Sequence, residues 1–247
     1  MHLISRRSLV AGSLAARAAT NVFAQSQLGN TKSKLKIVVT GGHPGDPEYG
    51  CGGTIARYAD LGNEVVLLYL NRGEKSCPEK TPNEGSDVRV PEARKACEIL
   101  RARPAFAGQC DGHAIVDAAN YEEFRKLVEA EKPDVLFAHC PIDGHRDHRA
   151  ISMLAYDAWL GMGKKCAFYY YEVSDGEDTL MFLPTHYVDI SGTESRKRAA
   201  CYAHASQAPD KFYALQSQVT RFRGLESGYP QAEAFIRHAQ SPGHWLP

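Results

Sequence analysis

Short runs of apolar and β-branched residues alternate along this chain with longer segments of helical character. The runs have the length and composition of buried strands and lie at positions 35–40, 64–70, 105–106, 134–139 and 165–172. The predicted helices span positions 48–61, 88–101, 121–131, 147–160, 194–206, 211–223 and 231–240. Because strands that alternate with helices favour parallel pairing, we predict a single α/β domain with a mostly parallel sheet and helices on both faces.

The composition excludes several classes of protein but does not indicate which reaction, if any, the protein catalyses. The chain has 247 residues, 43% hydrophobic and 23% charged, and 29 Lys and Arg balance 29 Asp and Glu. These values exclude a disordered chain, a collagen-like repeat and a coiled-coil rod. No surplus of basic residues exists to neutralise phosphates, so we expect no nucleic-acid partner. The seven cysteines are an odd number without C-x-x-C spacing, which favours buried free thiols over a disulfide framework.

The first 34 residues differ in character from the rest. Twin arginines, Arg6 and Arg7, precede a mildly apolar stretch at positions 9–19, and Val22 and Ala24 offer small residues for a cleavage site. The pattern resembles a bacterial twin-arginine export signal, although Arg17 interrupts its apolar stretch. We therefore predict a signal at 1–24, a linker at 25–34 and the folded domain at 35–247. The predicted location is the periplasm or the exterior, or the cytoplasm if this segment is not a signal. No run of about 18 apolar residues occurs, so no membrane association is expected once the signal is removed.

Two polar, histidine-bearing loops follow the first and fourth predicted strands. In one common strand order these strands are neighbours at the topological switch point, where ligands bind outside the carboxyl ends. His43 and Asp46 lie in the first loop, and His145 and His148 lie in the second. Together His43, Asp46 and His148 offer the ligand count of a catalytic zinc with an open position for water.

Other interpretations of these two loops remain open at this point. Two histidines and a carboxylate also form the facial triad of mononuclear iron oxygenases. Either loop alone fits a solvated turn or a helix cap. Dinucleotide binding is disfavoured because the glycines at 41–53 do not follow the spacing G-x-G-x-x-G.

Several motifs in order along the chain resemble the LmbE/PIG-L family of zinc-dependent N-acetylglucosaminyl deacetylases. The motifs are Gly42-His43-Pro44-x-Asp46-Pro47-Glu48, Gly50-Cys51-Gly52-Gly53-Thr54, Asn71-Arg72-Gly73-Glu74, Arg89-x-x-Glu92-Ala93, His145-x-Asp147-His148 and His204-x-Ser206-Gln207. The resemblance covers about positions 35–240. It implies a Rossmann-like fold and hydrolysis of an N-acetyl group from a small amino sugar or its conjugate.

The resemblance also implies roles for individual residues. His43, Asp46 and His148 would hold one Zn²⁺ per chain, and Fe²⁺ or another divalent ion is an alternative. His145 would lie near the developing oxyanion or the leaving amine, and Asp147 would orient a neighbouring histidine. The residues expected on the substrate side are Glu74, Arg89, Asp111 and His204. The sequence predicts neither the particular sugar nor the oligomeric state.

One position departs from the family pattern. The family usually has His-Pro-Asp-Asp where this chain has His43-Pro44-Gly45-Asp46, so the aspartate expected to act as general base is missing. General-base catalysis is worth about 10²–10⁴-fold in rate. Three outcomes follow. Another carboxylate, with Glu48, Asp143 or Asp147 as candidates, takes the role. Zinc alone activates the water. Or the chain is a zinc-containing, sugar-binding relative with weakened catalysis.

Overall fold

The computed structural model describes residues 34–75, 82–174, 176–243 and 246–247. Residues 34–247 form one compact unit. The predicted export signal at 1–24 and all but the last residue of the predicted linker lie outside the described residues and stay predictions. None of the described helices has the length and apolar character needed to cross a membrane.

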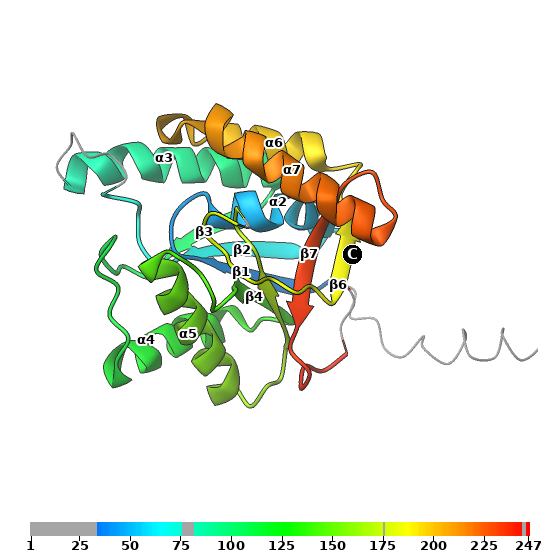
Figure 1. Ribbon diagram of the computed structural model, residues 1–247. Helices are drawn as coiled ribbons and strands as arrows, with labels where there is room; N and C mark the ends of the chain where they lie inside the picture. The colour runs from blue at the N-terminus through cyan, green and yellow to red at the C-terminus, as the bar shows by residue number, and fades with distance from the viewer. Residues whose placement is uncertain (1–33, 76–81, 175, 244–245) are drawn as a thin grey trace, which may run out of the picture. The chain divides into compact units, whose positions relative to one another are not determined.

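One mixed sheet forms the centre of the domain (Figure 1). Its strands are β1 (Lys36–Gly41), β2 (Glu64–Tyr69), β3 (Arg103–Phe106), β4 (Val135–His139), β5 (Ala167–Tyr171), β6 (His186–Asp189) and β7 (Ala232–Arg237). The strand order is β3-β2-β1-β4-β5-β7-β6; β1 to β5 pair in parallel, and β7 runs antiparallel to β5 and β6. The pairing of β1 with β4 confirms that the two histidine-bearing loops leave neighbouring strands.

Helices cover both faces of the sheet, as the alternating pattern predicts. In Figure 1, α2, α3, α6 and α7 lie on one face, and α4 and α5 lie on the other. The bounds are α2 (Asp46–Asp60), α3 (Pro82–Leu100), α4 (Ala118–Glu131), α5 (Arg146–Gly161), α6 (Glu194–Tyr202) and α7 (Pro209–Ser227), with a 3₁₀ turn at Ala205–Gln207. The predicted α/β fold class is therefore confirmed.

The alternation of side chains along β1 divides the core into two layers. Ile37 and Val39 join the cluster beneath α2 and α3, whereas Val38 joins the cluster beneath α4 and α5. All three are at most 1% exposed. Successive strand residues point to opposite faces, so a strand covered on both sides is a continuous apolar run. The six described cysteines are free, as predicted, and all but Cys110 are buried.

Two predicted elements differ in the structure, and one strand is additional. Positions 231–240 are not a helix, because β7 occupies Ala232–Arg237 between β5 and β6, and long-range pairing overrides the helix propensity of its Ala and Glu residues. The neighbouring β6 was not predicted at all. The helix predicted from position 88 begins at Pro82, which shortens the expected loop.

The glycine-rich start of α2 brings this helix unusually close to its neighbours. A Cβ atom at Gly50 would collide with the Tyr171 ring, and one at Gly53 would lie 2.5 Å from the Ile190 side chain. Glu233 accepts hydrogen bonds from the amides of Gly53 and Thr54 at 2.9 and 2.7 Å. The Gly50–Thr54 motif thus fixes α2 against the sheet, and Asp46 at its first turn with it.

A buried ion pair reinforces this junction. Lys197 Nζ of α6 lies 2.6 Å from Glu233 Oε1 of β7, and the two side chains are 0% and 1% exposed. Removing one partner of such a pair leaves a buried charge without compensation, which usually destabilises more than the pair itself contributes.

We expect Lys197→Met to lower the free energy of unfolding by about 3–5 kcal/mol, because Glu233 would then be buried without its cation. Urea denaturation followed by circular dichroism measures this. Lys95→Met is the control, because Lys95 pairs with Glu98 in solvent and such pairs contribute about 0–1 kcal/mol. Equal effects of the two substitutions would contradict the expectation.

Candidate metal centre and active site

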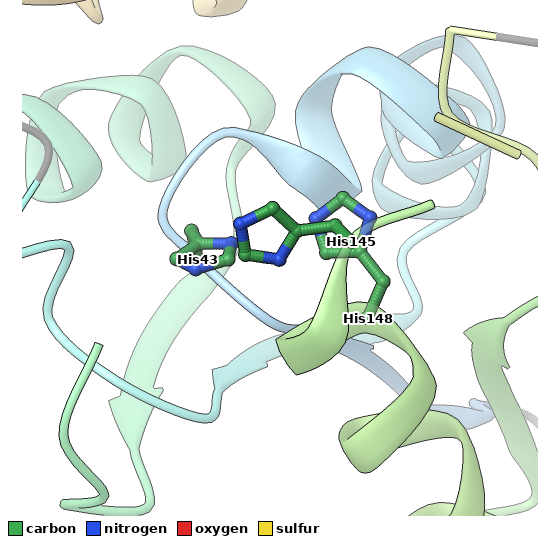
Figure 2. Close-up of side chains that lie close together, drawn as sticks. All are labelled: His43, His145 and His148. Atoms are coloured by element: carbon green, nitrogen blue, oxygen red, sulfur yellow. The ribbon is translucent and has the colours of Figure 1, made fainter. Parts of the chain in front are cut away.

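The two histidine-bearing loops meet at the carboxyl ends of β1 and β4. His43 follows β1, while His145 and His148 lie at the start of α5 (Figure 2). The ring centroids of His43 and His145 are 4.6 Å apart, as are those of His145 and His148. The chain continues from β1 into α2 on one face of the sheet and from β4 into α5 on the opposite face. The two loops therefore diverge at a topological switch point, where a ligand can bind.

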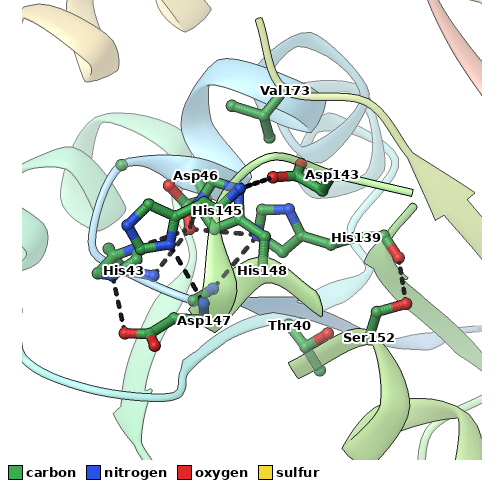
Figure 3. Close-up of polar contacts among 12 residues, drawn as sticks. Thr40, His43, Asp46, His139, Asp143, His145, Asp147, His148, Ser152 and Val173 are labelled. Carbon is green, nitrogen blue, oxygen red and sulfur yellow. Dashed lines mark hydrogen bonds and ion pairs between the residues drawn. The ribbon is translucent and has the colours of Figure 1, made fainter. Parts of the chain in front are cut away.

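Asp46 is the point on which the predicted metal ligands converge (Figure 3). Its Oδ2 atom lies 3.4 Å from His43 Nδ1 and 3.2 Å from His148 Nε2. The same oxygen accepts a hydrogen bond from the His43 amide at 2.8 Å. Burial alone would raise the pKa of Asp46, but His148, His139 and His43 hold it well below its usual range.

Carboxylates fix the outer nitrogens of both predicted ligand histidines. His148 Nδ1 lies 3.1 Å from Asp143 Oδ1, and His43 Nε2 lies 3.3 Å from both Asp111 and Asp147. In the neutral form of each ring, a proton held on the outer nitrogen would leave the inner nitrogen, which faces Asp46, free to bind a metal ion. Carboxylates behind histidines are the usual way in which proteins orient histidine ligands of a metal.

This arrangement gives Asp143 and Asp147 supporting positions. Asp147 is fully buried and accepts hydrogen bonds from the Gly112 amide at 2.6 Å and from Asn71 at 3.2 Å. Asp143, a predicted substitute base, also accepts from the His145 amide at 2.7 Å and from Thr179 Oγ1 at 3.1 Å. Neither carboxylate lines the cavity.

The donor set fits a divalent metal ion. In the described part of the chain, three groups of residues offer ligand atoms within 4.8 Å of one another, and each group includes residues from the two histidine-bearing loops. The groups are His43, His145 and His148; Asp46, His139 and His148; and His43, Asp111 and Asp147. Imidazole nitrogens combined with carboxylate oxygens suit zinc and also iron. The residues therefore support a metal site and leave the identity of the ion open.

His139 belongs to this cluster, although sequence reasoning assigned it no role. Its ring stacks on His148 at 4.2 Å, and its Nε2 lies 3.2 Å from both Asp46 Oδ2 and the Gly42 amide. Complete burial and the neighbouring His148 lower the pKa of His139 to about 4, so its ring is neutral. The position of His139 at the end of a predicted buried strand was the sequence signal that could have identified it.

His145 presents a defined hydrogen-bond donor. As the N-cap of α5, its Nδ1 accepts a hydrogen bond from the Asp147 amide at 3.2 Å. The proton of the neutral ring is then on Nε2. Burial and the neighbouring His43 and His148 lower the pKa of His145, which favours this neutral form. His145 lines the cavity and can donate to a ligand oxygen there.

A cavity of about 440 Å³ opens over this cluster, within the size range of small-molecule sites. Three of the four predicted substrate-side residues, Arg89, Asp111 and His204, line it. Glu74 does not; it is buried, and its carboxylate accepts from the Arg72 amide at 2.9 Å. Arg89, Asp111 and His204 thus face the cavity, while their substrate-binding roles stay predictions.

The predicted base candidate Glu48 lies behind the cavity rather than in it. It is fully buried and accepts hydrogen bonds from Tyr69 Oη at 2.7 Å and from His204 Nε2 at 3.0 Å. His204 Nδ1 is 3.5 Å from Arg89 Nη1, and Arg89 Nη2 donates to the Pro44 carbonyl. Glu48 and His204 therefore hold Arg89 and the loop after β1 in place.

The backbone conformation at Gly45 opposes a side chain at this position. Its φ is +114°, in a region that residues with side chains rarely adopt. A Cβ atom would find its nearest neighbour at 3.8 Å, so space is available and only the backbone conformation opposes a side chain. Restoring the family aspartate at this position would strain the loop by about 1–3 kcal/mol.

A third cavity-lining carboxyl group, Asp178, was not singled out from the sequence. It lies in the loop between β5 and β6. Burial raises its pKa to about 6. Asp46, Asp143 and Glu177 add to this increase, whereas His148 opposes it. No local pattern marks this residue, because only the fold brings its loop to the cavity.

Residues 38–159 match the family model described as GlcNAc-PI de-N-acetylase, PIG-L. The chain carries a domain of the PIG-L (LmbE-like) family. The PIG-L domain contains both histidine-bearing loops, and the family resemblance inferred from the motifs is thereby confirmed. The chain is 26% identical over 226 residues to the diacetylchitobiose deacetylase of Thermococcus kodakarensis, covering 80% of this chain and 81% of that protein.

Solved structures similar to this PIG-L domain protein share its fold. A conserved protein from Thermus thermophilus superposes with a TM-score of 0.73 and is 27% identical, with 86% of this chain and 98% of that chain covered. The N,N'-diacetylchitobiose deacetylase of Pyrococcus horikoshii gives 0.73 at 20% identity, covering 92% and 96%. The 4-carboxy-2-hydroxymuconate hydratase of Pseudomonas putida gives 0.75 at 22% identity, covering 86% and 100%. The last two likenesses concern the fold alone, and they show that it is compatible with more than one reaction.

We expect Asp143→Asn to weaken zinc binding by about 10- to 100-fold, because an amide fixes the orientation and basicity of His148 less well than a carboxylate. Competition with a chromogenic chelator measures the affinity. Asp157→Asn, further along α5, is the matched control and should leave it unchanged. Unaltered zinc affinity in Asp143→Asn would show that the contact with His148 does not matter for the metal.

Proposed function

We propose that this protein is a metal-dependent deacetylase that removes the acetyl group from an N-acetylated amino sugar or its conjugate. The observation that carries the proposal is that His43, Asp46 and His148 lie close together beyond the carboxyl ends of β1 and β4, within a PIG-L domain. The family description names a de-N-acetylase, and the relative from Thermococcus kodakarensis is a deacetylase. Both names favour this reaction over the iron oxygenase considered from the ligand types.

A zinc ion is the group we propose for this site. His43, Asp46 and His148 would hold it, with their orientation set by Asp143, Asp147 and Asp111. When bound, zinc would polarise the acetyl carbonyl and make water a stronger acid. The same donors accept Fe²⁺ or another divalent ion, so the proposal concerns a divalent metal first and zinc second.

The chain's own residues supply the remaining chemistry. The Nε2 proton of His145 is directed to stabilise the negative charge that develops on the carbonyl oxygen. Arg89 and Asp111 line the wall and offer a cationic donor and an acceptor for sugar hydroxyl groups. Water adds to the amide, the carbon–nitrogen bond breaks, and the products are acetate and the free amine.

Acetate release from N-acetylglucosamine, N,N'-diacetylchitobiose and N-acetylglucosamine conjugates tests the proposal. We expect the zinc-loaded native protein to release acetate and His148→Ala to lose more than about 100-fold of this activity, because a ligand is removed. Removal of the metal with a chelator should abolish the activity, and zinc should restore it.

Lys95→Met serves as the control, since Lys95 is exposed and lies on α3 outside the cavity. Full activity in His148→Ala would contradict the assigned metal site. No acetate from any member of the panel would contradict the deacetylase and leave the weakened, sugar-binding relative as the better description.

A further inference from the structure

Gly45 cannot act as a general base, so a carboxylate that faces the cavity is needed for this role. Among the described residues that line it, the carboxylates are Asp46, Asp111 and Asp178. Asp46 Oδ2 is surrounded by three imidazoles and one amide. Asp111 contacts His43 Nε2 through one oxygen and the Lys75 amide, at 2.9 Å, through the other. Asp178 is the one whose carboxylate makes no hydrogen bond or ion pair within the described part of the chain.

The carboxylates behind the cavity already contact other residues of the site. Glu48 holds Tyr69 and His204, Asp143 holds His148, and Asp147 holds His43. These three residues are 0–5% exposed and line no part of the cavity. Taking a proton on any of them would disrupt a contact that orients another site residue. Asp178 has no such contact to lose.

Backbone pairing fixes the position of Asp178. Asp143 and Thr179 form an antiparallel bridge between the two loops, and the Gly144 amide donates to the Asp178 carbonyl at 2.8 Å. The amide of Leu180 donates to the Ile142 carbonyl at 3.0 Å. Residues 142–144 lead directly into His145. The loop that carries Asp178 is thus fastened to the loop that carries His145 and His148.

We propose that Asp178 is the general base of this enzyme, in place of the aspartate that Gly45 lacks. This inference rests on the proposed deacetylase function. In the step it performs, an O–H bond of the attacking water breaks and its proton passes to the Asp178 carboxylate, while the water oxygen bonds to the acetyl carbon. When the carbon–nitrogen bond breaks, that proton passes to the leaving nitrogen, which regenerates the carboxylate.

Substitutions at Asp178 test this role directly. We expect Asp178→Asn and Asp178→Ala to lower kcat for acetate release by about 10²–10⁴-fold, with KM changed by no more than a few-fold and zinc content unchanged. Glu177→Gln, at an exposed carboxylate on the same loop, is the matched control and should keep native kcat.

Chemical rescue separates a proton acceptor from a merely structural residue. Asp178→Ala leaves a space beside the cavity, and added formate can supply a carboxylate there. We expect formate to raise kcat of Asp178→Ala in proportion to its concentration and to leave the native protein and Glu177→Gln unaffected.

The outcomes distinguish the two proposals. If the native protein and Asp178→Asn release acetate equally well, Asp178 is not the base and the deacetylase stands. If Asp178→Ala loses its zinc, or loses activity that formate does not restore, the residue is structural and the inference is wrong. If the native protein and Glu177→Gln both release no acetate, the deacetylase fails and the assignment of Asp178 fails with it.

Discussion

The convergence of three imidazoles on one oxygen of Asp46 is the constraint on which the rest of the site depends. His43, His139 and His148 reach this oxygen from the ends of two neighbouring strands or the loops that follow them, so the cluster depends on the pairing of β1 with β4. The carboxylates behind the cluster create a strong negative potential. Burial alone would lower the pKa of His148, yet Asp46 and Asp143 raise it to about 9. A site that draws protons this strongly also attracts divalent cations.

The position of Asp46 depends in turn on how closely α2 packs. Glycines in its first half allow the helix to touch the Tyr171 ring and the Ile190 side chain, where any Cβ atom would force it away. Glu233 and Lys197 anchor the same stretch from β7 and α6. The glycine-rich motif therefore contributes to the chemistry indirectly, by placing the first turn of α2, and it requires no phosphate ligand to explain it.

Much of this architecture could be predicted from local pattern, and the parts that could not share a physical reason. The apolar runs of β1, β2 and β4 could be recognised as strands, and the loops after β1 and β4 contain the site histidines. β7 was predicted to be a helix because its partners, β5 and β6, lie far from it in sequence. Asp178 was missed for the same reason, since only the pairing of residues 142–144 with 178–180 brings it to the cavity. His139 was visible as a strand-ending histidine and was passed over.

The proposed metal ligands are all present in this chain, whereas the aspartate expected as general base is not. This difference follows from the different precision that the two proposed roles require. A metal ligand must lie at a bond length of about 2.0–2.2 Å and at a fixed angle, so the proposed ligands His43, Asp46 and His148 depend on the register of two strands. A general base needs only hydrogen-bond reach to a water molecule, about 2.6–3.2 Å, and any wall of the cavity can provide it. The backbone at Gly45 has a conformation that disfavours a side chain. A carboxylate on the opposite loop, already fastened beside His145, can then take over the proton without disturbing a single ligand.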